Sequence, residues 1–219
     1  MDPVCDLVLP CRDEAPALRV LLPTVPEEFA VIVVDNGSRD GTADVARALG
    51  ATVVAESRAG YGAAVHAGVL AARREFVAVM DGDDSFDPAA LLPLLADVRS
   101  GRADLAVGRR RPVGRGVWPW HARTGNAIVL WLLRRRIRVT VHDIAPIRVC
   151  RRDALLGLAV QDRRFGYPLE LLLKATAAGW RFVERDVAYR PRAAGTRSKV
   201  SGSMRGTLRT ARDFWRVMA

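Results

Sequence analysis

Cysteine and lysine are among the scarce residues of this 219-residue sequence. It holds three cysteines, and only two of its 34 basic residues are lysines. Cys5, Cys11 and Cys150 are too few and too scattered for a disulfide scaffold, and no Cys/His spacing matches a zinc site. We therefore expect reduced thiols in a cytoplasmic setting.

Long hydrophobic runs are also missing. The apolar stretch 128–133 ends at three arginines, far short of the ~20 apolar residues that span a bilayer. The first residues show no basic region followed by an apolar run, so we expect no secretory signal. These absences favour a cytoplasmic protein, with a peripheral position on the inner face of the plasma membrane left open.

Acidic and basic residues are unevenly distributed. The net charge is +10, but residues 1–100 sum to −8 (8 Arg against 16 Asp and Glu) and residues 101–219 to +18 (26 Lys and Arg against 8 Asp and Glu). Such a split indicates an anionic partner for the second half, for example a membrane surface or a phosphorylated substrate. The alternative explanation of the charge split is a general bias of the sequence toward arginine, without any anionic partner. Because no nucleic-acid-binding motif or basic-aromatic pattern is present, we expect no nucleic-acid partner.

Short apolar runs alternate with helical patterns through the first half. Strands are expected over 4–9, 31–34, 52–55, 76–80 and 104–107, with helices near 18–22, 42–49, 62–74, 88–98 and 168–175. This alternation predicts an α/β protein with an open, mostly parallel sheet flanked by helices. We expect a single domain over 1–200, divided into halves 1–108 and 109–200, and a C-terminal amphipathic helix over 201–219.

Acidic residues follow three of these strands. Glu14 follows the first strand, Asp35 ends the second, and Asp81 and Asp83 follow the fourth. In such sheets the ligand binds outside the carboxyl ends of the strands, although a single acid there is usually a helix cap. Two carboxylates separated by one residue suit Mg²⁺ or Mn²⁺, which takes oxygen ligands and completes its shell with water and phosphate. We therefore expect Asp81 and Asp83 to bind the metal.

Several motifs resemble those of a known family. Residues 10–14 (PCRDE), 33–42 (VVDNGSRDGT) and 80–83 (MDGD) are similar to successive motifs of the family 2 glycosyltransferases, which have the GT-A nucleotide-sugar fold. Segments 107–110, 123–126, 140–148, 165–170 and 191–203 resemble the dolichyl-phosphate mannosyltransferase-like branch. The resemblance covers about residues 4–207. It implies a GT-A-type, Rossmann-like domain that binds a nucleotide-sugar donor.

The resemblance also implies roles for individual residues. The expected nucleoside-binding residues are Pro10, Glu14 and Asp35, and the expected metal and diphosphate residues are Asp81 and Asp83. Arg110 and Arg123 match basic positions near the diphosphate and the acceptor phosphate. A loop that closes over phosphates in relatives corresponds here to Arg192, Arg197, Ser198 and Lys199. Asn36 departs from the family pattern, because it stands where a second acidic residue is often found.

Two further acids have two interpretations each. Asp143 is the candidate to position the acceptor or act as a base, and the alternative is a structural carboxylate paired with Arg148. Glu170 lies on an apolar helix, where a charged residue usually has a partner. That partner is either an arginine on the substrate side, which would make Glu170 a substrate-binding residue, or a structural ion pair.

The leading hypothesis is a metal-dependent, inverting hexosyltransferase. It would move a hexose from GDP-mannose or UDP-glucose to a polyprenyl or dolichyl phosphate, with Asp83, Asp143 and Arg123 as catalytic residues. The apolar stretch 128–133 and its arginines, and the amphipathic pattern over 204–218, would meet a membrane surface or a membrane-bound partner. The alternatives are the same fold acting on a soluble hydroxyl compound, and a non-catalytic nucleotide-binding or membrane-scaffold protein.

Overall fold

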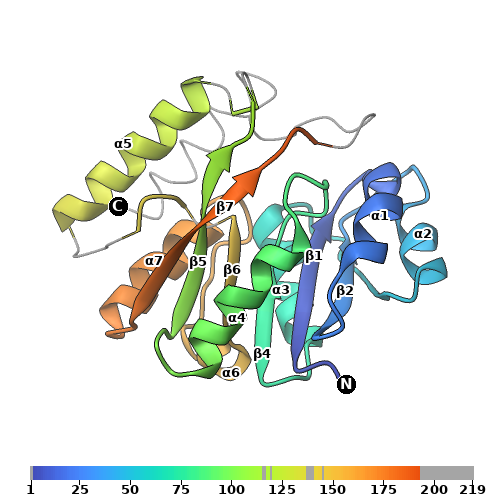
Figure 1. Cartoon of the computed structure of the whole chain (residues 1–219), viewed down its shortest axis with the longest axis horizontal. Coiled ribbons are helices and arrows are strands. Elements are labelled where there is room, and N and C mark those ends of the chain that lie inside the picture. Colours follow the sequence, from blue (N-terminus) through green and yellow to red (C-terminus); the bar gives the residue numbers. More distant parts are fainter. Residues whose placement is uncertain (1, 115–116, 119, 137–140, 145, 193–219) are drawn as a thin grey trace.

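A seven-stranded sheet forms the centre of the protein, which is described here by a computed structural model (Figure 1). The structure describes residues 2–114, 117–118, 120–136, 141–144 and 146–192. The strand order is β3-β2-β1-β4-β6-β5-β7. The strands are β1 (Cys5–Cys11), β2 (Phe29–Asp35), β3 (Thr52–Ala55), β4 (Phe76–Val79), β5 (Leu105–Pro112), β6 (Ile147–Arg151) and β7 (Phe182–Tyr189).

Six of these strands run parallel to one another and β6 runs against them. β6 pairs antiparallel with both of its neighbours, β4 and β5, whereas the β1–β2, β1–β4, β2–β3 and β5–β7 pairs are parallel. Cys11 pairs with Asp35, and Val8 pairs with Val79. The carboxyl ends of β1, β2 and β4 therefore meet at one edge, which confirms the mostly parallel sheet.

Helices cover both faces of the sheet. One face packs against α1 (Ala15–Leu21), α2 (Thr42–Ala48) and α4 (Leu91–Arg99), and the other against α3 (Tyr61–Ala71), α5 (Trp120–Arg136), α6 (Arg152–Gly157) and α7 (Tyr167–Ala177). In Figure 1, α4 lies in front of the sheet and α3 behind it. Two short 3₁₀ helices, η1 (Leu22–Thr24) and η2 (Pro88–Ala90), follow α1 and precede α4.

The two hydrophobic layers follow from the pleat of the strands. On β1, Leu7 and Leu9 point into the layer beneath α1 and α4, whereas Val8 points into the layer with α3. Successive side chains of a strand face opposite sides of a sheet, so a strand buried on both faces is apolar throughout. This explains why residues 7–11 of β1 form a continuous apolar run rather than an alternating pattern.

The later strands differ from the expectation. β3 spans the expected residues and β1, β2 and β4 lie within two residues of theirs, but β5 continues five residues beyond Val107. β6 and β7 were not expected. Among the described helices, none combines the length and the hydrophobicity needed to cross a bilayer. The expected helix over 201–219 lies outside the described residues, as do Arg197, Ser198 and Lys199.

Candidate active site

Four acidic side chains converge around Cys11, the last residue of β1. Burial, followed by the charges of Glu14, Asp83, Asp81 and Asp35, raises the pKa of the Cys11 thiol well above its usual value. The structure thus brings together acids from three separate strand ends, as the parallel register requires. Because a thiol among four carboxylates stays protonated, Cys11 acts as a buried spacer and not as a nucleophile.

The loops after β1 and β2 are bound to each other. The Asp13 amide donates to Ser38 Oγ at 3.0 Å, and Asp13 Oδ1 accepts the amide of Arg39 at 2.8 Å. Asp40 Oδ2 accepts the Ala15 amide at 2.9 Å. Asp13 has a φ of 53°, an uncommon left-handed conformation for a residue with a side chain. These bonds join the loop that carries Glu14 to the loop that follows Asp35 in one rim, and Pro10 lies beside it on β1, opposite Val34.

Asn36 has a structural role in this rim. Its amide nitrogen donates to the carbonyls of Glu56 at 2.8 Å and Arg58 at 2.9 Å, and its Oδ1 accepts the Gly60 amide at 2.9 Å. An aspartate has no N–H and could not donate the first two bonds. The departure from the acidic residue of the family pattern is therefore explained by the loop over 56–60, which Asn36 holds in place.

Asp81 and Asp83 form a pair of like charges. Asp83 is buried, and its oxygens accept the amide of Ser85 at 3.0 Å and Nε of Arg192 at 2.8 Å. Burial and the charge of Asp83 raise the pKa of Asp81 to about 6, against the opposing charges of nearby arginines. Two carboxylates in one site disfavour each other's ionisation unless a cation is present.

The donor set at this pair fits a hard cation. Ser85 is fully buried, yet its Oγ has no hydrogen-bond partner among the described residues. No group of three or more His, Cys, Asp or Glu side chains suited to a metal occurs in the described parts of the chain. Mg²⁺ and Mn²⁺ do not require one, since one or two carboxylates with water and phosphate oxygens suffice. Asp81, Asp83 and the Ser85 hydroxyl are the residues that could hold it.

Arg110 on β5 is fixed by Asp143, which is fully buried. Its Nε and Nη2 donate to the two carboxylate oxygens at 2.8 and 2.6 Å, and its backbone N–H donates to Oδ2 at 3.0 Å. The guanidinium carbon lies 4.2 Å from the ring centre of Trp118 and 5.8 Å from that of Tyr189. The alternative in which Asp143 pairs with Arg148 is therefore wrong, because the β5 strand brings Arg110 to Asp143 instead.

Arg148 occupies a different place, on β6. It is 1% exposed, and its Nη2 lies 3.4 Å from the Tyr61 hydroxyl. Its guanidinium carbon lies 5.9 Å from the ring centre of Tyr61 and 5.8 Å from that of Tyr167. Its charge, with those of Arg192 and Arg110, acts to lower the pKa of Asp81. A buried cation thus faces the acidic pair from the antiparallel strand.

Within the part of the chain that the structure describes, Glu170 pairs with a lysine and with no arginine. Its two oxygens accept the amides of Gln161 at 2.9 Å and Asp162 at 2.6 Å, and Oε1 also lies 2.9 Å from Nζ of Lys174. The structure thus shows the structural ion pair, and the substrate-binding role of Glu170 stays a prediction. Arg123 is exposed on the first turn of α5.

Sequence reasoning missed several residues of the site. Trp118 and Tyr189 border Arg110, Tyr61 borders Arg148, and Ser85 adds a hydroxyl beside the acidic pair. Their only signal in the sequence was position, since Ser85 follows the acidic motif and Tyr61 begins a helix after a glycine. Aromatic contacts with arginines depend on how the strands assemble and leave no local pattern.

The fold and the acidic rim together define a GT-A-type nucleotide-sugar domain. The sequence model of glycosyl transferase family 2 matches residues 6–156, and the chain belongs to this family. An uncharacterized glycosyltransferase of Mycobacterium tuberculosis is 55% identical over 213 residues, 97% of each chain. The dolichyl-phosphate hexose transferase of Haloferax volcanii is 34% identical over 77% of this chain and 73% of its own. These relatives confirm the dolichyl-phosphate mannosyltransferase-like branch.

Solved structures confirm the fold. Glucosyl-3-phosphoglycerate synthase from Mycobacterium tuberculosis, in complex with Mn²⁺, UDP-glucose and phosphoglyceric acid, superposes with a TM-score of 0.76 and 19% identity. The match covers 99% of this chain and 78% of that one. At this identity the likeness concerns the fold alone, and it accounts for the whole seven-stranded sheet.

Proposed function

We propose that this chain is a metal-dependent, inverting glycosyltransferase that moves a hexose from GDP-mannose or UDP-glucose to a polyprenyl phosphate. The proposal rests on family membership and on a relative named for a dolichyl-phosphate acceptor. A structural neighbour binds Mn²⁺ with UDP-glucose, which supports a metal and a nucleotide sugar.

The hydrogen bonding of the Asp143 carboxylate is the observation that supports a phosphate rather than a hydroxyl acceptor. Its two oxygens accept four hydrogen bonds, three from Arg110 and one from the Ile144 amide at 2.7 Å. An ionised carboxylate has about four lone-pair positions, so Asp143 has none left to take a proton from a hydroxyl. A phosphate acceptor arrives ionised and needs no such base. Asp143 therefore positions Arg110 rather than acting as a base.

The remaining residues divide between the donor and the leaving group. The rim with Pro10, Glu14 and Asp35 would hold the nucleoside. A divalent cation held by Asp81, Asp83 and Ser85 would supply Lewis-acid charge to the diphosphate. Arg192 lies beside Asp83 and adds a fixed positive charge there.

The transfer itself needs no proton at the acceptor. An acceptor phosphate oxygen forms a bond to C1 of the sugar while the bond from C1 to the diphosphate oxygen breaks on the opposite face. The nucleoside diphosphate leaves with the electron pair. Arg110, held between Asp143 and Trp118, would bind the incoming phosphate through its remaining N–H groups. Arg123 and the loop residues Arg197 and Lys199 are proposed to add further cationic contacts, and Ser198 a hydroxyl donor.

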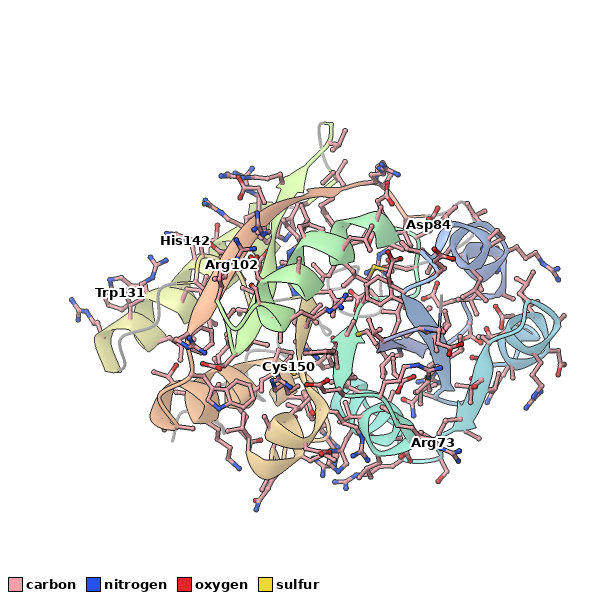
Figure 2. All side chains as sticks on the ribbon, turned by 60° about the horizontal axis from the view of Figure 1, so that its bottom comes forward. Arg73, Asp84, Arg102, Trp131, His142 and Cys150 are labelled. Atoms are coloured by element: carbon pink, nitrogen blue, oxygen red, sulfur yellow. The ribbon has the colours of Figure 1, made fainter. Side chains whose placement is uncertain are left out.

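Helix α5 would bring the enzyme to the lipid surface. Leu130 and Leu133 pack into the core, whereas Ile128 and Trp131 are 53% and 51% exposed. Figure 2 shows Trp131 projecting from the outer side of α5. The Arg135 guanidinium carbon lies 4.1 Å from the ring centre of Trp131. An exposed tryptophan covered by a cation suits the interface of an anionic membrane.

The direct test is transfer of labelled sugar by the purified protein. GDP-mannose and UDP-glucose are each offered with Mg²⁺, Mn²⁺ or a chelator, and with a short-chain polyprenyl phosphate, the matching polyprenol or 3-phosphoglycerate. We expect metal-dependent product with polyprenyl phosphate only, and more than a hundredfold loss in Asp83→Ala. Asp44→Ala is the matched control, because Asp44 is an exposed acid on α2.

Two outcomes would overturn the proposal. Transfer to polyprenol as fast as to its phosphate would show that a hydroxyl is the acceptor and that a base exists. Donor binding without transfer to any acceptor would favour the non-catalytic scaffold. Co-sedimentation with anionic vesicles tests the membrane contact separately: Trp131→Ser should weaken it at least threefold, and Leu70→Ser, an equally exposed residue on α3, should not.

A further inference from the structure

Glu184 on β7 holds the segment that carries Asp143. Its Oε1 accepts the backbone N–H of His142 at 2.6 Å and that of Asp143 at 3.2 Å. Its Oε2 lies 2.7 Å from Nδ1 of His142. The Glu184 side chain is only 14% exposed. One carboxylate thus binds three polar groups of two consecutive residues.

This segment reaches the site through a second carboxylate. Asp143 binds the guanidinium of Arg110 with two parallel hydrogen bonds. Glu184 and Arg110 lie on neighbouring strands, since β5 and β7 pair in parallel with Val107 opposite Glu184 and Arg110 opposite Val187. The chain of contacts therefore runs from β7 through the 141–144 segment and returns to β5 at Arg110.

Within the described part of the chain, the other contacts that elements outside this segment make with its backbone have neutral acceptors. Asn126 on α5 accepts the Ile144 amide at 3.2 Å, and its amide nitrogen lies 3.5 Å from the His142 carbonyl. Arg134 donates to the Val141 carbonyl at 3.0 Å. Backbone N–H groups bound to a carboxylate form shorter and stronger bonds than those bound to a neutral amide. Glu184 is therefore the principal hold on the backbone from which Asp143 projects.

We propose that Glu184 is a positioning residue for the acceptor phosphate. It fixes the backbone of Asp143, and Asp143 in turn orients the Arg110 guanidinium toward the acidic rim. The inference rests on the proposed function of Arg110 as an acceptor-phosphate ligand. A misplacement of about 1 Å in a positioned group can cost roughly a hundredfold in rate. Loss of Glu184 should therefore act on the acceptor step and leave donor binding unchanged.

The test compares Glu184→Ala, Glu184→Gln and the control Asp186→Ala. Asp186 is an acid on the same strand, but it is 54% exposed and pairs with Arg111 on the surface. We expect Glu184→Ala to lower kcat/KM for polyprenyl phosphate ten- to a hundredfold, with Kd for the nucleotide sugar and Mn²⁺ within twofold of wild type. Glutamine keeps an oxygen for both N–H groups and should recover at least half of that loss on a logarithmic scale.

A double-mutant cycle distinguishes positioning from a general loss of structure. If Glu184 acts through Asp143, Glu184→Ala should cost less than twofold in the Asp143→Ala background. Full additivity of the two losses would overturn the proposal. So would a wild-type kcat/KM in Glu184→Ala, or an equal loss in Asp186→Ala.

A measurement without turnover separates this proposal from the proposed function. Amide hydrogen exchange over 141–144 should be at least tenfold faster in Glu184→Ala and unchanged in Asp186→Ala. If the wild type transfers no sugar, the proposed function fails while the exchange result still tests the hold of Glu184 on the segment. If transfer proceeds but exchange is unchanged in Glu184→Ala, the positioning role alone is refuted.

Discussion

Asp81→Asn should stabilise the metal-free protein while removing its function. Burial and the neighbouring Asp83 raise the pKa of the Asp81 carboxyl from an ordinary 3.8 to about 6. At neutral pH the folded protein must therefore hold two adjacent negative charges that the unfolded chain keeps apart in water. An asparagine keeps the shape of the side chain and removes one of the two charges.

The size of this effect follows from the difference of about two between the pKa of Asp81 in the folded protein and its ordinary value. Each unit corresponds to about 1.4 kcal/mol, and because Asp81 is partly exposed we expect a contribution of about 1 to 3 kcal/mol. Between about pH 4 and pH 6 the folded protein holds a proton that the unfolded chain has released. The free energy of unfolding should therefore fall as pH rises through this window, and the part due to Asp81 should be absent in Asp81→Asn.

Urea denaturation from pH 4 to pH 7.5 in the presence of a chelator measures this difference. We expect Asp81→Asn to be more stable than wild type by about 1 to 3 kcal/mol at pH 7.5 and equal to it at pH 4. Mn²⁺ should stabilise the wild type and leave the variant unchanged. Asp44→Asn, on the exposed face of α2, is the control and should show no such pH dependence. A variant less stable than wild type at pH 7.5 would refute the reasoning.

Three further substitutions test the architecture around the site. Asp143→Ala leaves the Arg110 side chain, which is only 20% exposed, without its carboxylate and should lower the free energy of unfolding by about 3 kcal/mol in urea; a loss under about 1 kcal/mol would contradict the pairing. Gly62→Ala places a methyl 2.7 Å from a backbone carbonyl and should lower stability by about 1 to 3 kcal/mol, whereas Gly157→Ala has open space and should not. Asn36→Asp loses two amide donors to carbonyls and should cost about 2 kcal/mol by thermal unfolding, and an unchanged Tm would show that those bonds contribute nothing.

The first half of the fold was predictable because its signals are local. The strands β1, β2 and β4 there are largely buried and mostly apolar, and each ends at a polar turn. Acids at the ends of such strands must share an edge, so Asp35 and Asp81 could be placed together before the structure was known. This inference needed only the direction of the strands.

The second half was less predictable because its strands depend on tertiary pairing. β6 carries Arg148 in the middle of a buried stretch, so the strand does not read as an apolar run. The antiparallel direction of β6 also has no local sequence signal. β7 lies at the edge of the sheet, where half-exposed positions accept charged residues such as Glu184 and Asp186. The continuation of β5 through Arg110 forms only because β7 pairs with it.

The ion-pair partner of Asp143 was likewise not predictable from the sequence. Arg148 is five residues away in sequence, and Arg110 is 33 residues away. Closeness along the chain favoured Arg148. The fold instead places Arg148 on β6 between two tyrosines, and it brings the end of β5 against Asp143. Which cation a buried carboxylate meets is decided by strand order, which the sequence alone did not specify beyond the fifth strand.

The charge split between the halves has a structural meaning as well. Among the described residues, five arginines of the basic half bind acids of the acidic half, in the pairs Arg102–Asp97, Arg151–Glu75, Arg185–Asp97, Arg190–Asp87 and Arg192–Asp83. Part of the excess positive charge therefore binds the two halves together and is not available to a partner. Arg110 and Arg148 act on the acidic pair together with Arg192, and Asp143 and the tyrosines hold these two arginines in fixed positions. An anionic acceptor would respond to these positioned cations far more than to the total charge, because exposed charges are screened within about 10 Å.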